Sequence, residues 1–138
     1  MDLRPGPVIR WVLALAALSS IVACGGGGGE PVGLDPTGAN VQSEVFNKSC
    51  AFSTCHAGAS PSGDMNLVDP SLANIVGVPS SQQPDLNRIE PGDPDRSYLY
   101  LKLTQDTPAV GDRMPNTVPL DDERIELVRA WILASAPE

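Results

Sequence analysis

The sequence is poor in histidine, cysteine and aromatic residues, and each shortage narrows the kinds of site that the chain can build. It contains one histidine and three cysteines in 138 residues. A metal centre with two imidazole ligands from the same molecule is therefore excluded. A structural zinc site, which usually takes four Cys or His ligands, lacks its usual second pair. Aromatic residues make up 4% of the chain, so a single small domain is short of bulky core side chains.

Basic residues are also few, and this shortage bears on the partners of the chain. Nine Lys and Arg stand against 17 Asp and Glu, which gives a formal net charge of −8. So acidic a chain argues against nucleic acid as a partner, because both molecules carry negative charge. Basic patches on partner proteins are compatible with this charge.

Residues 1–23 have the features of a lipoprotein export signal. Arg4 and Arg10 supply positive charge around the start of the apolar run 11–18, which is too short to span a bilayer. The segment ends in an aliphatic residue, two small or apolar residues and Cys24, an order that resembles the bacterial lipobox. This resemblance implies that Cys24 becomes the lipid-modified N-terminus. The alternative is ordinary cleavage just before Cys24, which would leave a free thiol.

A lipid on Cys24 would place the chain in a bacterial cell envelope, anchored to a membrane and facing the periplasm or the cell surface. Gly25 stands where an acidic residue often marks retention in the inner membrane, and this favours the outer membrane. Residues 24–38 include five consecutive glycines and are typical of a flexible tether. The folded domain is expected at residues 39–138, a length that suits one domain.

The only histidine directly follows one of two closely spaced cysteines. In the stretch Cys50-Ala51-Phe52-Ser53-Thr54-Cys55-His56, four residues separate the two thiols. A Cys-His pair after a nearby Cys is the attachment pattern of c-type haem, although the usual spacing has two intervening residues. In that chemistry both thiols form thioethers with the vinyl groups of haem, and the adjacent imidazole binds the iron. The stretch is therefore a candidate attachment site for one haem c.

Two other uses of this stretch stay open on spacing alone. Exported chains often stabilise small domains with disulfides, and a four-residue loop between Cys50 and Cys55 can close as one. A metal-ion site formed by Cys50, Cys55 and His56 would need a further carboxylate ligand and is less favoured.

Four short helices are expected, and no strand pattern of any length competes with them. Each begins at a capping Asn or Asp and carries apolar residues at helical spacing. In the third helix Tyr98, Leu101 and Leu103 would face the core, and in the fourth Arg124 and Arg129 would stay outside. The remaining segments are loops by composition, so the class is all-α with long loops. The helices are expected near residues 40–49, 69–76, 94–104 and 121–132, with caps at Asn40, Asp69, Asp93 and Asp121.

A haem iron bound by the histidine would need its second axial ligand from elsewhere in the chain. Electron-transfer haems commonly pair His with Met, and the thioether raises the reduction potential. Once the signal is removed, Met65 and Met114 are the only methionines. Met65 follows His56 by nine residues, which leaves little slack to reach the opposite face of the ring. Met114 lies in a loop before the last helix, next to the stiffening Pro115, and is the better candidate.

Six short segments occur in a specific order between about Val41 and Pro137. They are Cys-x4-Cys-His-x-Gly, Gly-Asp-Met-Asn-Leu, Glu-Pro-Gly-Asp-Pro-Asp-Arg-Ser-Tyr-Leu, Arg-Met-Pro, Leu-Asp-Asp-Glu-Arg-Ile and Arg-Ala-Trp-Ile. Together they resemble a small c-type cytochrome domain of the kind found in envelope proteins of myxobacteria and planctomycetes. The resemblance implies a cytochrome c-like all-α fold around one haem. It also implies thioethers at Cys50 and Cys55, proximal His56 and distal Met114, with Met65 used for packing.

The combined interpretation is a membrane-tethered monohaem cytochrome that exchanges single electrons with redox partner proteins and is not an enzyme. A peroxidase would need an open distal site with polar groups, and Met114 would fill that site. The alternative is a haem-free lipoprotein, closed by a Cys50–Cys55 disulfide, that acts as an adaptor or binding module. A third possibility is a haem-based sensor in which a small ligand displaces Met114.

Overall fold

The computed structural model describes residues 33–108 and 110–137, so the expected signal segment, Cys24 and most of the tether lie outside the described residues. Within these ranges the regular elements are helical, and extended segments meet only in three isolated bridges. The described chain is therefore mostly helical without a sheet, in agreement with the expected all-α class. No helix in these ranges is long and apolar enough to cross a membrane.

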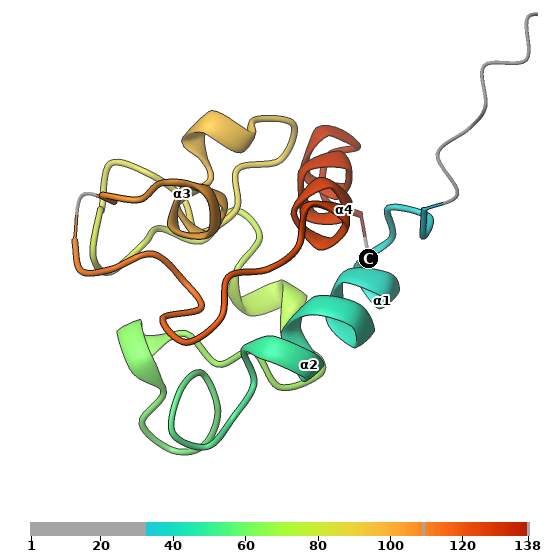
Figure 1. Ribbon diagram of the computed structural model, residues 1–138. Helices are drawn as coiled ribbons and strands as arrows, with labels where there is room; N and C mark the ends of the chain where they lie inside the picture. The colour runs from blue at the N-terminus through green and yellow to red at the C-terminus, as the bar shows by residue number, and fades with distance from the viewer. Residues whose placement is uncertain (1–32, 109, 138) are drawn as a thin grey trace, which may run out of the picture.

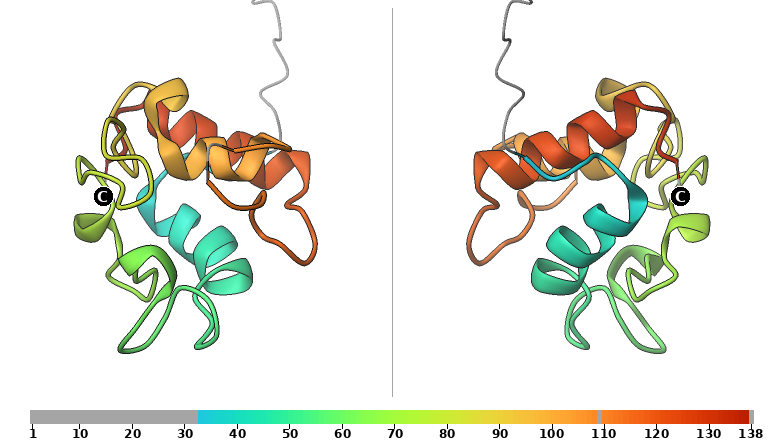
Figure 2. Two further views of the ribbon diagram at one scale, coloured as in Figure 1. Left: turned by 90° about the vertical axis from the view of Figure 1, so that its left-hand side faces the viewer. Right: turned by 90° about the vertical axis from the view of Figure 1, so that its right-hand side faces the viewer.

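The N-terminal helical segment lies on one side of the molecule and the two later helices on the other, and long loops join them (Figure 1). The helix that closes the chain, α4, packs against both α1 and α3, and Figure 2 shows α3 and α4 side by side above the N-terminal helix. The elements in chain order are α1 (Gly38–Val41), a π-helical turn (Gln42–Phe46), α2 (Asn47–Ser49), 3-10 turns (Ser62–Asp64, Leu72–Asn74, Pro94–Arg96), α3 (Tyr98–Thr104) and α4 (Asp122–Leu133).

The first expected helix is present, but it begins earlier than the sequence indicates. Thr37 caps it, because its hydroxyl accepts a hydrogen bond from the backbone N–H of Asn40 at 3.2 Å. The expected cap at Asn40 is therefore wrong, and this residue lies inside the first turn. The expected apolar residues Val41, Val45 and Phe46 are fully buried, and their burial fixes this helix against the rest of the core.

The prediction of a helix at residues 69–76 is wrong, because the structure contains only the single 3-10 turn Leu72–Asn74 there. Beyond this turn the backbone bonds across the molecule: Ile89 donates its N–H to the carbonyl of Ile75 at 3.0 Å, and Gly77 donates to the carbonyl of Ile89 at 2.9 Å. These groups would otherwise continue a helix. Ile75 and Ile89 are fully buried, so long-range packing overrides the local helical pattern.

The third expected helix, residues 94–104, is present as two pieces. Asp93 caps the first piece as expected, because its carboxylate accepts hydrogen bonds from the backbone N–H groups of Asp95 and Arg96. The break falls at Ser97, whose backbone angles are extended (φ −94°, ψ 100°). The pieces are the 3-10 turn before Ser97 and α3 after it.

Ser97 also fixes how α3 meets the core. Its hydroxyl is fully buried and accepts a hydrogen bond from the backbone N–H of Glu90 at 2.9 Å. Leu101 is only half-buried, so the expected inward orientation is wrong for this residue. The buried residues of α3 are Tyr98, Leu99, Lys102 and Leu103.

The last helix, α4, closes the core. Asp121 caps it as expected, because its carboxylate accepts the backbone N–H of Arg124 at 2.9 Å. Arg129 is exposed as expected, whereas Arg124 is half-buried and donates from Nε to the carbonyl of Glu44 at 3.0 Å. This bond joins the last helix to the first across the domain. The buried residues of α4 are Leu127, Val128, Trp131 and Ile132.

Candidate functional site

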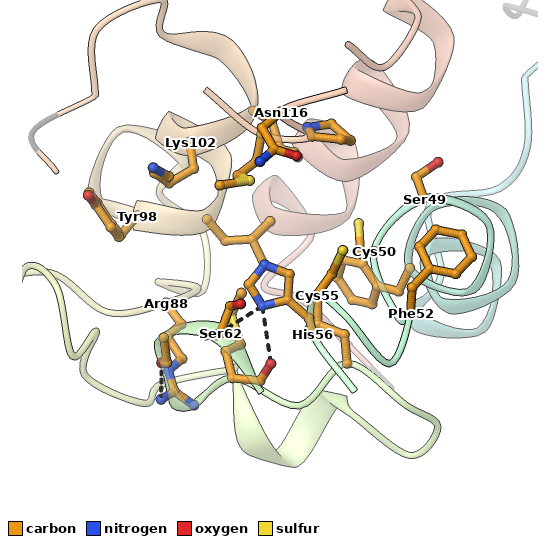
Figure 3. A pocket seen from close by; sticks show the side chains of 18 of the residues that line it. Ser49, Cys50, Phe52, Cys55, His56, Ser62, Arg88, Tyr98, Lys102 and Asn116 are labelled. Carbon is orange, nitrogen blue, oxygen red and sulfur yellow. Dashed lines mark hydrogen bonds between the residues drawn. The ribbon is translucent and has the colours of Figure 1, made fainter. Parts of the chain in front are cut away.

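A cavity of about 420 Å³ lies between the end of the N-terminal helix, the loops that follow it, α3 and the loop before α4 (Figure 3). This volume falls in the usual range for small-molecule and cofactor sites. Much of its inner wall is apolar, with Phe46, Leu67, Leu99 and Leu103 contributing buried side chains. The cavity brings together all five residues considered as haem attachment points or ligands: Cys50, Cys55, His56, Met65 and Met114.

His56 is held in one orientation by backbone carbonyls. Its Nδ1 lies 3.0 Å from the carbonyl oxygen of Ser62 and 3.3 Å from that of Met65. A carbonyl oxygen can only accept, so Nδ1 must carry the proton and donate it. In the neutral ring the lone pair then sits on Nε2, which points away from the two carbonyls and into the cavity (Figure 3). Metal-binding histidines are commonly held in this way, with one ring N–H donating to a backbone carbonyl and the other ring nitrogen left to bind the metal.

The two cysteines line the cavity beside this ring. Cys50 ends the N-terminal helix and is buried, while Cys55 is half-buried. Burial raises the pKa of the Cys50 thiol to about 12, and the neighbouring Cys55 adds a smaller upward effect. Cys50 is therefore a neutral thiol near neutral pH, and both thiols are free in the structure.

The loop between the cysteines is closed by backbone hydrogen bonds. The N–H of His56 donates to the carbonyl of Cys50 at 3.2 Å, and the N–H of Cys55 donates to the carbonyl of Phe52 at 2.9 Å. This compact loop keeps the thiols and the imidazole on one cavity wall despite the four intervening residues. Among residues 33–108 and 110–137, no three His, Cys, Asp or Glu side chains gather as a metal-ion site.

The two methionines reach the cavity from different directions. The backbone of Met65 lies behind the imidazole, because its carbonyl accepts from Nδ1 of His56. Met114 belongs to the loop before α4, and its N–H donates to the carbonyl of Lys102 at 2.7 Å. Next to it, Arg113 donates from Nε to the carbonyl of Leu103 at 2.7 Å. These bonds fix the Met114 loop to α3. In Figure 3, Lys102 of α3 and Asn116 of this loop lie on the side of the imidazole away from the two carbonyls.

The charge of the cavity differs from that of the whole chain. Among the described residues that line it, Arg88 and Lys102 are cationic and none is acidic, although the net charge of the chain is −8. Lys102 is buried and donates from Nζ to the carbonyls of Val110 and Asp112. Burial lowers its pKa, with a smaller opposing effect from Asp112. In the view of Figure 3 both cations lie to the left of His56 and the cysteines to its right.

Some residues that shape the site were not identified from the sequence. Gln42 is buried, donates from Nε2 to the carbonyl of Leu67 at 2.9 Å and accepts from the hydroxyl of Ser71. It thereby ties the loop after the candidate site to the N-terminal helix. A signal for Gln42 exists, since it lies four residues before Phe46 and so on the same helix face. Lys102 likewise lies four residues after Tyr98 and so on the same face of its helix.

Taken together, the cavity offers an imidazole nitrogen with a free lone pair, two thioethers, two thiols and two cations. Such a set could hold a flat, largely apolar cofactor that carries a metal ion and acidic groups. The cavity is open at one side, where exposed residues such as Phe52 and Thr54 line it. No protein-family model, curated protein or solved structure matches this chain.

Proposed function

We propose that this chain is a small c-type cytochrome that carries one haem and transfers single electrons in a bacterial cell envelope. The observation that carries the proposal is the orientation of His56, whose Nδ1 donates to two backbone carbonyls while Nε2 faces the cavity. The same cavity is lined by both free thiols and by Met114. The fold proposed for the domain is correspondingly cytochrome c-like.

Each site residue has a separate role in this proposal. Cys50 and Cys55 would hold the group covalently as thioethers, and His56 would bind its metal through Nε2. Met114 would supply a second ligand to the metal, a soft thioether that favours the reduced iron. Haem, when bound, supplies the one-electron chemistry, while the chain sets the potential through ligands, burial and hydrogen bonds.

The walls of the cavity suit haem in two further respects. The buried apolar side chains would exclude water from the ring, and the ring would in turn supply the apolar bulk that a chain with 4% aromatic residues lacks. The propionates of haem lie on the edge opposite its vinyl groups. Arg88 and Lys102, on the other side of His56 from Cys50 and Cys55 in Figure 3, would therefore face the acidic edge.

The proposal also assigns a location and partners. A lipid on Cys24 would anchor the chain to a membrane, with the outer membrane favoured, and the glycine-rich tether would let the domain reach redox partner proteins. With Met114 as an axial ligand, the distal side would be closed to substrates. We therefore propose electron transfer rather than catalysis.

The test is chemical and uses the full-length chain produced in a host with a c-type maturation system. We expect the denatured protein to give the reduced pyridine haemochrome spectrum of a c-type haem, and the intact mass to include one haem. A colourless protein lighter by two hydrogens would contradict the proposal. It would indicate a Cys50–Cys55 disulfide and support the adaptor function, if a second maturation system gave the same result.

The choice between the two methionines gives a separate prediction. We expect Met114→Ala to leave haem attached but to open its distal side, so that the reduced protein binds carbon monoxide. Met65→Ala is the matched control and should keep a closed, six-coordinate spectrum, because the backbone of Met65 lies behind the imidazole. Carbon monoxide binding by the reduced variants is read from visible spectra. Carbon monoxide binding by Met65→Ala alone would show that the ligand assignment is wrong.

A further inference from the structure

The carbonyls that orient His56 belong to an unusual piece of backbone, the turn at residues 62–65. It contains one 3-10 turn, and both Gly63 (φ 63°) and Asp64 (φ 53°) have left-handed backbone angles. Such angles cost most residues with a Cβ atom some strain, and aspartate is among those that tolerate them best. The three residues 62–64 are also exposed, so buried apolar packing does not hold this turn in place.

Arg88 supplies contacts that hold the turn. Its guanidinium donates from Nη2 to the carbonyl of Asp64 at 3.0 Å and to that of Gly63 at 3.5 Å, and from Nη1 to the carbonyl of Asn74 at 2.9 Å. The planar fork of arginine suits several acceptors at once, which the ammonium group of lysine does not. Ser81 adds one further bond, from its hydroxyl to the carbonyl of Gly63 at 2.8 Å.

Both backbone groups of Arg88 are hydrogen-bonded to the rest of the fold. Its N–H donates to the carbonyl of Val78 at 2.7 Å, and its carbonyl accepts from the N–H of Leu99 in α3 at 3.0 Å. The next residue, Ile89, is fully buried. The guanidinium therefore connects a rigid part of the fold to an exposed turn, and that turn presents the carbonyls of Ser62 and Met65 to the imidazole.

We propose that Arg88 is a positioning residue that fixes the orientation and tautomer of His56 by holding the turn at residues 62–65. The proposal rests on the proposed function for the role of His56 as a metal ligand. The hydrogen bond at Nδ1, in contrast, is expected with or without haem. Loss of the guanidinium frees the turn, weakens the bonds from Nδ1 to Ser62 and Met65, and makes the imidazole a poorer electron donor at Nε2.

The experiment compares the full-length protein with its Arg88→Met, Arg88→Lys and Arg96→Met variants. Arg96→Met is the matched control, because it makes the same chemical change at an exposed residue that does not line the cavity. The first readout is the solvent exchange rate of the Nδ1 proton of His56, measured by nitrogen-15 NMR in the reduced state. The second is the midpoint potential of the haem.

We expect Arg88→Met to raise the exchange rate of the Nδ1 proton by up to about tenfold, the effect of losing one typical hydrogen bond. The midpoint potential is compared in Arg88→Lys, because Arg88→Met also removes a positive charge that the proposed function places beside the haem. It should rise in Arg88→Lys, since a less electron-rich imidazole stabilises oxidised iron less. Arg88→Lys keeps the charge without the fork, so we expect an intermediate exchange rate. Arg96→Met should match the unaltered protein in both readouts.

Three results would overturn the inference. One is a folded Arg88→Met protein with an unchanged exchange rate, and another is an equal change in Arg96→Met. If Arg88→Met does not fold, unaltered exchange in Arg88→Lys would be the third. If the unaltered chain carries no haem, the proposed function fails separately. The inference then still predicts a single Nδ1–H tautomer in the unaltered protein and mixed tautomers in Arg88→Met.

Discussion

Replacing His56 by alanine is expected to abolish the low-spin haem spectrum. His56 is the only histidine of the chain, so no other imidazole could take its place at the iron of the proposed haem. Visible spectra of the oxidised and reduced variant are the measurement. Added imidazole should restore the low-spin spectrum, because it is the group that the substitution removes from the cavity.

The matched control for this prediction is Ser62→Ala. Ser62 holds His56 through its backbone carbonyl rather than its hydroxyl, so this variant should keep the low-spin spectrum. A His56→Ala protein with an unchanged low-spin spectrum would show that the iron ligand lies elsewhere. A change of equal size in Ser62→Ala would show that the spectrum responds to disturbance of the turn rather than to the lost ligand.

Trp131→Ala is expected to cause the largest loss of stability among single substitutions in the core. Trp131 is fully buried in α4, and its indole N–H donates to the carbonyl of Pro137 at 2.8 Å. Truncation of a buried tryptophan to alanine typically lowers the free energy of unfolding by about 3–5 kcal/mol. Total stabilities of small domains are about 5–15 kcal/mol, so this is a large fraction. Urea unfolding followed by circular dichroism measures the loss.

Two further substitutions separate the causes of this effect. Leu133→Ala is the matched control on the same helix, since Leu133 is 48% exposed, and it should change the free energy of unfolding by less than about 1 kcal/mol. Trp131→Phe keeps most of the apolar volume but loses the bond to Pro137, so its cost should lie between the two. All variants must be compared in the same haem state, because a bound group changes stability. Equal stabilities of Trp131→Ala and Leu133→Ala would contradict the prediction.

Helix positions could be predicted where local signals and long-range packing agree. At α4 the capping carboxylate of Asp121 and the apolar face point to the same element, and the structure contains it. At residues 69–76 they conflict, because Ile75 and Ile89 become buried by bonding to each other across the molecule. A single sequence does not reveal that pairing. The same limit applies at Ser97, where a bond to the backbone of Glu90 interrupts an otherwise helical pattern.

The site residues also divide into those that a single sequence can predict and those that it cannot. Cys50, Cys55 and His56 are close in sequence and carry distinctive chemistry, so their clustering could be predicted. The position of Met114 in a loop before the last helix makes it a candidate ligand, and the structure shows that it lines the same cavity. Arg88 could not be identified, because its partners are backbone carbonyls, which every residue provides. Its role depends on the left-handed angles at Gly63 and Asp64, and those angles become visible only in the folded chain.

The bond between Arg124 and Glu44 joins residues 80 positions apart, and this separation has a consequence for the order in which the protein is made. During synthesis the N-terminal helix is made well before α4, although the two pack against each other in the folded chain. Contacts between distant segments form late because long loops must first be closed. We therefore expect Cys50, which belongs to the same buried cluster as the apolar residues of α4, to stay accessible on a partly made chain until α4 is present to complete that cluster.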